Sequence, residues 1–288
     1  MKNQIKTILL LGALSAVLIG FGSLLGPGMF YLFTALAVLM NVGAYFLSDR
    51  LVLRMHGARE VAPHEAPALH EMVSELAGRA GIPMPRVAII PADYANAFAT
   101  GRSPEKGVVA VTEGLLRLMG PRELRGVIAH EIAHIKNRDI LVSTIAAAIA
   151  AAVSYAGNAV QWAAIFGGGS QQSDDEGGSP LGALALAIVA PIAALLIQMG
   201  ISRSREYLAD ETAARLTQDP EGLALALQRL TRAAEVIPSH PQPATASLFI
   251  VNPLAGGSAL LSLFSTHPPM EKRIAHLRAV ARHLGIAA

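Results

Sequence analysis

Three long stretches of the chain carry no charged residue, and polar stretches separate them. The uncharged stretches are residues 7–48, 140–173 and 177–202. A helix that spans a bilayer needs about 20 consecutive, mostly apolar residues. The pattern therefore predicts four transmembrane helices, at about 7–25, 29–47, 140–165 and 181–200.

The composition agrees with a membrane protein. Charged residues make up 15% of the chain and hydrophobic residues 52%, whereas about 25% of the residues of an ordinary soluble domain are charged. Lys2 and Lys6, ahead of the first apolar run, are also compatible with a cleaved signal peptide. No small-x-small cleavage site follows, and a second apolar run comes at once, so a retained membrane anchor is favoured.

The distribution of lysine and arginine predicts the orientation, because these residues are enriched in cytoplasmic loops. Residues 48–139 contain 12 of them and residues 200–288 contain 9, while the short turn 26–28 and the loop 167–180 contain none. We therefore expect the N-terminus and both polar stretches in the cytoplasm and the two short loops outside. The net charge of +2 then reflects membrane topology and requires no nucleic-acid partner.

The two polar stretches, 48–139 and 201–288, are expected to fold together as one cytoplasmic domain with helices and a small sheet. Apolar periodicity and turn residues predict its elements. The expected strands are 86–90, 96–101 and 107–116, in a small and largely antiparallel sheet. The expected helices are one within 65–82 that stops at Gly81, one that starts at Pro121, 204–216, 220–237 with Asp219 as its cap, and 268–284. A long loop, 238–257, lies between the last two helices.

The helix that starts at Pro121 carries the candidate chemistry. His130 and His134 are four residues apart, so both imidazoles lie on one helical face and can bind one cation. Glu131 lies about 100° round the helix, beside the cation and not on it. This is the arrangement of the H-E-x-x-H motif, in which two histidines bind zinc and the glutamate is the general base. We expect the helix to continue into the span 140–165 and so to hold the metal just above the bilayer.

A catalytic zinc needs a third protein ligand, and the chain has no cysteine to supply it. Helix 204–216 offers Glu206 and, one turn on, Asp210, with small alanines on the same side. Glu206 is expected to be the ligand and Asp210 to accept a ring N–H from a ligating histidine. A solvated helix with Glu206 in surface ion pairs is the competing interpretation, and Glu211 lies on a different face.

Two residues near the C-terminus are further candidates. His267 comes directly before the last helix, where it can donate to the developing oxyanion, hold the substrate, or simply begin the helix. Arg273, one turn into that helix, is expected to pair with an acidic group such as Asp210.

Four motifs together resemble a known family. "HEIAH", "SRSREYLADETAA", "NAFATGR" and "STHPPMEKRI" occur in the order and membrane setting of the HtpX heat-shock membrane proteases and, more distantly, of the CaaX prenyl endopeptidases. The resemblance covers essentially the whole chain. It implies a gluzincin-type zinc endopeptidase of the bacterial inner membrane that degrades misfolded or unassembled membrane proteins under stress. It also implies that "NAFATGR" is an edge strand that binds the substrate, with contacts at Asn96 and Ala97.

Other classes of protein remain as alternatives. An intramembrane zinc protease of the site-2 type also has H-E-x-x-H, but it recruits an Asp-Gly motif that this sequence lacks. A metal transporter or sensor needs polar ligands at mid-membrane, and the four spans offer no charged residue or histidine. An inactive scaffold is disfavoured by the presence of Glu131. The sequence names no natural substrate and no oligomeric state.

Overall fold

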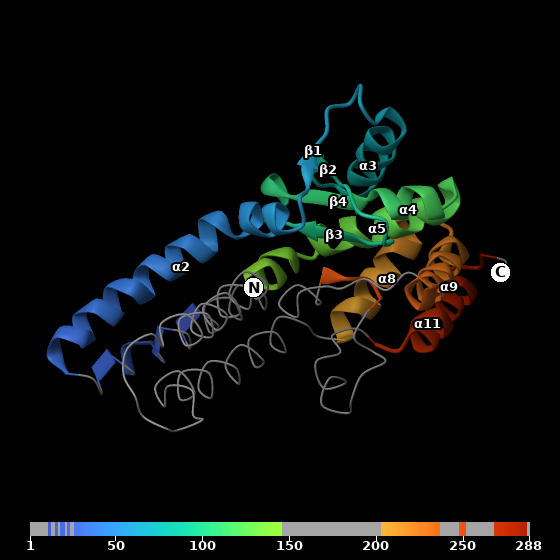
Figure 1. Ribbon diagram of the computed structural model, residues 1–288. Coiled ribbons are helices and arrows are strands. Elements are labelled where there is room, and N and C mark those ends of the chain that lie inside the picture. Colours follow the sequence, from blue (N-terminus) through green and yellow to red (C-terminus); the bar gives the residue numbers. More distant parts are fainter. Residues whose placement is uncertain are drawn as a thin grey trace, which may run out of the picture.

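The computed structural model describes residues 26–145, 203–236, 248–251 and 268–286, together with short stretches between 11 and 23. The expected span 181–200, the loop 167–180 and His267 lie outside these residues, as do most of the spans 7–25 and 140–165. Helix α2 (Pro27–Met55) projects as a long arm from a domain that holds all the other labelled elements (Figure 1).

Four strands form the sheet of this domain. They are β1 (Arg59–Glu60), β2 (Arg86–Ile90), β3 (Ala97–Thr100) and β4 (Val108–Thr112), in the spatial order β1-β2-β4-β3. The pairs β1–β2 and β3–β4 are antiparallel, whereas β2 and β4 run parallel. The three expected strands are present, but the third ends at Thr112, because residues 113–116 of the expected strand belong to helix α4 (Glu113–Leu118), and the sheet is mixed. The chain leaves β2, forms β3 at the far edge, and returns between them, which makes β4 parallel to β2.

The described helices follow the sequence periodicity closely. Besides α2 they are α3 (Pro67–Ala80), the 3₁₀ turn η1 (Pro104–Lys106), α4 (Glu113–Leu118), α5 (Pro121–Lys136), α8 (Arg203–Thr217), α9 (Pro220–Val236) and α11 (Met270–His283). Asp219 caps α9, as expected, because its Oδ1 accepts a hydrogen bond from the Gly222 N–H at 3.1 Å.

Both faces of the sheet are buried. Side chains alternate along each strand, so one set packs with α3 and α5 and the other packs against the end of α2. The first set includes Val87, Ala97, Ala99, Val109 and Val111. The second set, Ala88, Ile90, Phe98, Val108 and Ala110, contacts Val52 and Leu53 of α2 and Leu248. These contacts pack the end of α2 against the sheet.

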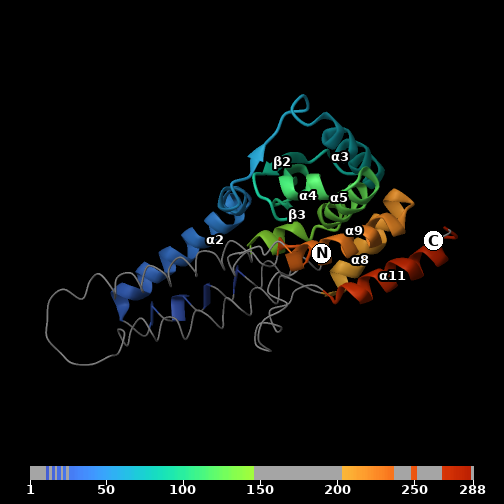
Figure 2. The same cartoon turned by 45° about the vertical axis from the view of Figure 1, so that its right-hand side comes forward.

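Helix α5 lies at the centre of the domain, between the sheet and the helices α8, α9 and α11 (Figure 2). Pro121 occupies its first turn, and the Glu123 carboxylate accepts a hydrogen bond from the Gly120 N–H at 2.9 Å. Gly126 allows α9 to approach at backbone distance, since a Cβ there would lie 2.7 Å from the Leu223 nitrogen. This close contact fixes α5 one turn before its motif residues.

Helix α5 ends at Lys136, which corrects the expectation of one helix that continues into the span 140–165. Asn137 and Arg138 form a turn, Arg138 has a φ of 58°, and a new helical segment begins at Ile140. The Asp139 N–H donates to the His134 carbonyl at 3.0 Å and closes the turn. The backbone N–H groups of Asn137, Arg138 and Asp139 donate to the last carbonyls of α5, and the positive φ of Arg138 changes the direction of the chain before the apolar run.

Among the described residues, no single straight helix is long and apolar enough to cross a membrane, but the two arms of α2 meet that criterion together. The arms, Phe30–Gly43 and Tyr45–Met55, are bent by 66° relative to each other. The expected span 29–47 falls within this helix. Its outer surface exposes many large apolar side chains, among them Tyr31, Leu32, Val38, Leu39, Val42, Phe46 and Leu47.

Candidate metal centre

Three side chains from α5 and α8 converge on one point. The Nε2 atoms of His130 and His134 lie 3.2 Å apart. Glu206 faces both of them, with Oε2 at 3.6 Å from His130 Nε2 and Oε1 at 3.5 Å from His134 Nε2. One ligand atom from each of the three residues lies within 4.8 Å of the others, close enough to share a cation. The structure therefore brings together the two histidines and the glutamate that the sequence pattern singled out.

The second nitrogen of each imidazole faces a carboxylate. His130 Nδ1 lies 3.0 Å from Asp210 Oδ1, and His134 Nδ1 lies 3.3 Å from Asp139 Oδ2. When a metal is bound, these carboxylates can accept the Nδ1–H and leave both Nε2 lone pairs for the metal, which is the usual support of a metal-ligating histidine. Sequence analysis anticipated Asp210 but missed Asp139. The charged residue directly after the motif helix was the available signal.

Arg273 of α11 contacts Asp210, the carboxylate that faces His130 Nδ1. Its side chain is fully buried and donates two hydrogen bonds to Asp210, from Nε at 2.9 Å and from Nη2 at 2.6 Å. Burial alone would raise the pKa of the Asp210 carboxyl, but Arg273 and His130 outweigh it and lower the pKa below its ordinary value. Asp210 is therefore an ionised acceptor, and the expected Arg273–Asp210 pair is present.

The charge state of His130 depends on its burial and on the charged groups of Arg273, Asp210 and Glu206. Burial and the nearby Arg273 lower its pKa, whereas hydrogen bonds to Asp210 and Glu206 raise it, and the net result is a pKa of about 9. Without a cation His130 thus holds a proton between two carboxylates. Binding of a metal must displace that proton, so the metal and the proton compete for the same nitrogen.

Glu131 lies beside the cluster without joining it. Its side chain is buried, and burial is the main cause of the raised pKa of its carboxyl; Glu206 raises the pKa further, while His130, His134 and a backbone hydrogen bond from Ala99 oppose the shift. A carboxylate with a raised pKa accepts a proton more readily than an ordinary one. The bond to Ala99 also places Glu131 against strand β3.

Strand β3 is the outer strand on this side of the sheet. The Thr112 N–H donates to the Asn96 carbonyl at 2.9 Å, so Asn96 faces β4. In an antiparallel pair such bonding alternates along the strand, and Ala97 and Ala99 therefore direct their backbone groups away from β4, towards the edge where no other described strand pairs with β3.

The side chain of Asn96 is occupied within the protein. Its Nδ2 donates to the Leu248 carbonyl at 3.3 Å, and its Oδ1 accepts from the Ile250 N–H at 3.1 Å. Asn96 thus fixes the short segment 248–251 across the end of β3. A substrate contact by Asn96 stays a prediction, as does any role of His267, which lies outside the described residues.

The donor set fits a zinc ion. Two imidazole nitrogens and one carboxylate oxygen are the ligands of many catalytic zinc sites, which leave a fourth position for water or substrate. In such sites the second ring nitrogen of each histidine commonly donates a hydrogen bond to a carboxylate, as Asp210 and Asp139 allow here. A buried carboxyl next to a site of this kind defines a class of protein, the metallopeptidases.

Comparison with known proteins identifies the family. Residues 63–281 match peptidase family M48, and the chain therefore belongs to this family. The matched residues include all three candidate ligands as well as Glu131, Asp139, Asp210 and Arg273.

Relatives of full length support the assignment. The chain is 53% identical to a protease HtpX homolog of Syntrophobacter fumaroxidans over 284 residues, which cover 97% of this chain and 100% of that protein. It is 50% identical to a protease HtpX homolog of Thermococcus kodakarensis over 284 residues, with 98% and 97% covered. The resemblance to HtpX proteases drawn from the four motifs is thereby confirmed.

A solved structure supports the fold. The crystal structure of S. mikatae Ste24p matches 96% of this chain with a TM-score of 0.50 and 16% sequence identity. The match spans 65% of the Ste24p chain, which is therefore considerably longer. At this identity the likeness concerns the fold alone.

Proposed function

We propose that this metallopeptidase is a zinc endopeptidase of the cell membrane that cleaves cytoplasmic segments of misfolded or damaged membrane proteins. One observation carries the proposal: helix α5, which bears Glu131 and two of the three candidate metal ligands, packs against β3, the outer strand of the sheet. An extended peptide that adds to this edge comes within reach of both. A globular substrate must first expose such a peptide, which favours unfolded or unassembled proteins.

In this proposal His130, His134 and Glu206 hold the zinc ion. When bound, zinc supplies a Lewis acid that polarises the scissile carbonyl and lowers the pKa of water to about 7. Asp210 and Asp139 keep each imidazole in the tautomer that offers Nε2. Arg273 holds Asp210 in place and keeps it ionised.

Glu131 moves the proton. Its carboxylate accepts a proton from the attacking water as the water oxygen bonds to the carbonyl carbon. It then passes that proton to the amide nitrogen, so that the C–N bond breaks and a neutral amine leaves. The raised pKa of Glu131 suits the first step, because it makes the carboxylate a better base. His267 is the proposed donor to the developing oxyanion.

Strand addition is the proposed mode of substrate binding. The outward backbone groups of Ala97 can pair with an extended peptide, which gives affinity without demanding a particular sequence. Asn96 would act on the same peptide through the segment 248–251, which its amide fixes at the end of the edge. A protease for damaged proteins needs this tolerance of sequence.

The membrane setting rests on the apolar runs. We propose four spans, at about 7–25, 29–47, 140–165 and 181–200, with the N-terminus and the protease domain in the cytoplasm. The exposed apolar surface of α2 supports the second span, because large apolar patches on a protein surface mark contacts with protein or lipid. The metal ligands lie in the domain with the sheet, which favours this proposal over an intramembrane protease of the site-2 type.

Purified full-length protein provides the test. After chelation it should cleave casein or itself only when zinc is added back, and magnesium should not replace zinc. Zinc-loaded protein that leaves both casein and itself intact would contradict the proposal and favour a metal sensor or transporter.

A further inference from the structure

A polar pocket lies near the end of α2, and none of the candidate metal ligands lines it. It has a volume of about 260 Å³, and its lining comes from α2, from β2 and the residues before it, and from the loop before β4. The lining residues are Phe46, Asp49, Arg50, Met84, Arg86, Arg102, Glu105, Lys106 and Gly107. Four of them are cations and two are acids, so the net charge of the lining is +2.

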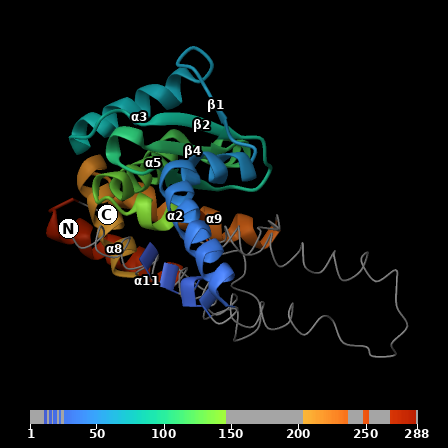
Figure 3. The same cartoon turned by 90° about the vertical axis from the view of Figure 1, so that its left-hand side faces the viewer.

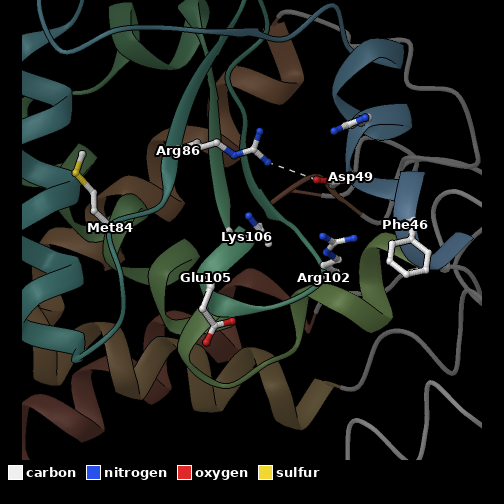
Figure 4. Close-up of a pocket in the computed structure, with 9 residues that line it drawn as sticks. Phe46, Asp49, Met84, Arg86, Arg102, Glu105 and Lys106 are labelled. Atoms are coloured by element: carbon white, nitrogen blue, oxygen red, sulfur yellow. Dashed lines mark hydrogen bonds and ion pairs between the residues drawn. The ribbon is translucent and has the colours of Figure 1, made fainter.

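The cations are only partly neutralised. Arg86 pairs with Asp49 at 3.4 Å and also with Glu60. Within the described part of the chain, Arg50, Arg102 and Lys106 form no ion pair. Figure 4 shows the charged ends of Arg86, Arg102 and Lys106 directed into one space, while the Glu105 carboxylate points away from it. An anion in this space would meet several donors at once.

The backbone conformation of the loop before β4 positions these cations. Gly101 has a φ of +135°, and a Cβ at this position would lie 2.5 Å from the Lys106 carbonyl oxygen. The loop therefore folds back on itself between Gly101 and Gly107, with the turn η1 at its tip, and brings Arg102 beside Lys106. The Arg102 guanidinium also lies 5.1 Å from the centre of the Phe46 ring, which holds it against α2.

The position along α2 indicates which anion fits. The apolar part of α2 ends at Ser48, and Asp49 and Arg50 follow directly. Leu39, Val42 and Leu47 are exposed on the part of α2 that leads to the pocket. Figure 3 looks towards the domain from the side of α2 and shows this helix reaching the strands (Figure 3). Cations at the cytoplasmic end of an apolar helix attract anionic lipid headgroups.

We propose that this pocket binds the phosphate of an anionic phospholipid, with the acyl chains along the exposed face of α2. Pockets for drug-sized molecules occupy about 300–1,000 Å³, so 260 Å³ holds a headgroup but not a whole lipid. Arginine forks suit phosphate oxygens in both charge and geometry. The bound lipid would fix the height and tilt of the domain, and with it the edge of β3, relative to the membrane surface. The proposal rests on the membrane setting of the proposed function.

Lipid titration of the full-length protein in detergent, followed by native mass spectrometry, tests the site. Phosphatidylglycerol should bind more tightly than phosphatidylcholine. Arg102→Gln should weaken the first phosphatidylglycerol about tenfold, the effect of losing one charge-assisted hydrogen bond, and Arg102→Lys should weaken it less. Arg232→Gln, which removes an exposed cation from α9, is the matched control and should bind as the wild type does.

Two outcomes would overturn the proposal. Equal phosphatidylglycerol binding by Arg102→Gln and Arg232→Gln would show that the pocket contributes nothing. Displacement of the lipid by millimolar inorganic phosphate would show a site for free phosphate. Zinc-dependent cleavage of casein in detergent, and extraction of the protein from membranes by carbonate, are measured in parallel. Loss of the zinc-dependent cleavage, or release of the protein by carbonate, would count against the proposed function, whereas lipid binding reports on the pocket alone.

Discussion

Arg273 and Asp210 form a two-point ion pair, at 2.6 and 2.9 Å, that is fully buried behind His130. The pair joins α11 to α8, and Asp210 in turn contacts His130 on α5 at 3.0 Å. Three helices that are distant in sequence thus meet through one chain of charged groups. The metal centre and the packing of the C-terminal helix are therefore coupled.

Removal of one partner of this pair should destabilise the domain strongly. Arg273→Met leaves Asp210 as a buried charge with its main partner gone, and breaking such pairs costs about 3–5 kcal/mol of unfolding free energy. The double variant Arg273→Met with Asp210→Leu leaves no such charge, so its unfolding midpoint should recover much of the loss. Zinc affinity should stay reduced in the double variant, because His130 has lost its support. Equal stability of the single and double variants would show that the unpaired charge of Asp210 does not cause the destabilisation.

Glu131→Gln should separate catalysis from metal binding. Glutamine keeps the shape of the side chain but cannot accept the proton, so peptide hydrolysis should fall by at least about 100-fold. Zinc content, measured by atomic absorption after dialysis, should remain one ion per chain. Loss of zinc together with activity would make Glu131 a ligand and overturn its role as the base.

Glu206 and Asp210 should differ in how zinc rescues their variants. Glu206 faces both Nε2 atoms, so Glu206→Ala should lose zinc and activity together. Asp210 contacts only the far nitrogen of His130, and loss of such a partner typically costs 10–100-fold in affinity or activity. Asp210→Ala, and likewise Asp139→Ala, should regain part of its activity in excess zinc. The opposite pattern would exchange the roles of Glu206 and Asp210, and full activity of both would make His267 the next candidate.

The orientation of the chain can be tested with single cysteines, since the natural sequence contains none. A cysteine at Ser173, in the loop without lysine or arginine, should react with an impermeant thiol reagent added to intact cells. A cysteine at Ser247, in the second polar stretch, should react only after lysis. The reverse labelling would place the protease domain outside the cell and would contradict cleavage of cytoplasmic segments.

Asp219 should make stability depend on acid pH. Hydrogen bonds from Arg122 are the main cause of the lowered pKa of the Asp219 carboxyl; burial opposes the shift and the Gly222 N–H adds to it. A group with a lowered pKa stabilises the fold at pH values above its ordinary pKa of about 4, and this contribution disappears as the pH falls through the folded-state pKa.

The matched variant for this prediction is Asp219→Asn, which can still cap α9 but carries no charge. The unfolding midpoints of wild type and variant should differ at neutral pH and converge as the pH falls below about 4. Asp219→Ala should cost roughly 1 kcal/mol more, because the cap is lost as well. A difference between wild type and Asp219→Asn that does not change with pH would exclude the charge as its source.

The sequence by itself determined the features that depend on spacing within one helix. His130 and His134 share a face because they are four residues apart. Glu206 and Asp210 have the same separation, so when Glu206 faces the metal site, Asp210 lies one helical turn further along the same face of α8. The cap of α9 at Asp219 is equally local. Such features survive folding unchanged, because neighbouring residues in a helix keep their relative positions whatever packs around them.

Tertiary structure decided everything that depends on partners far apart in the chain. The sheet is mixed because β4 enters between β2 and β3, an order that alternation of apolar residues does not encode. Arg273 reaches Asp210, 63 residues away, only because α11 packs against α8. The amide of Asn96 binds a segment more than 150 residues away. Strand order, chain reversal and long-range hydrogen bonds are selected by the packing of the whole domain, so no local pattern can specify them.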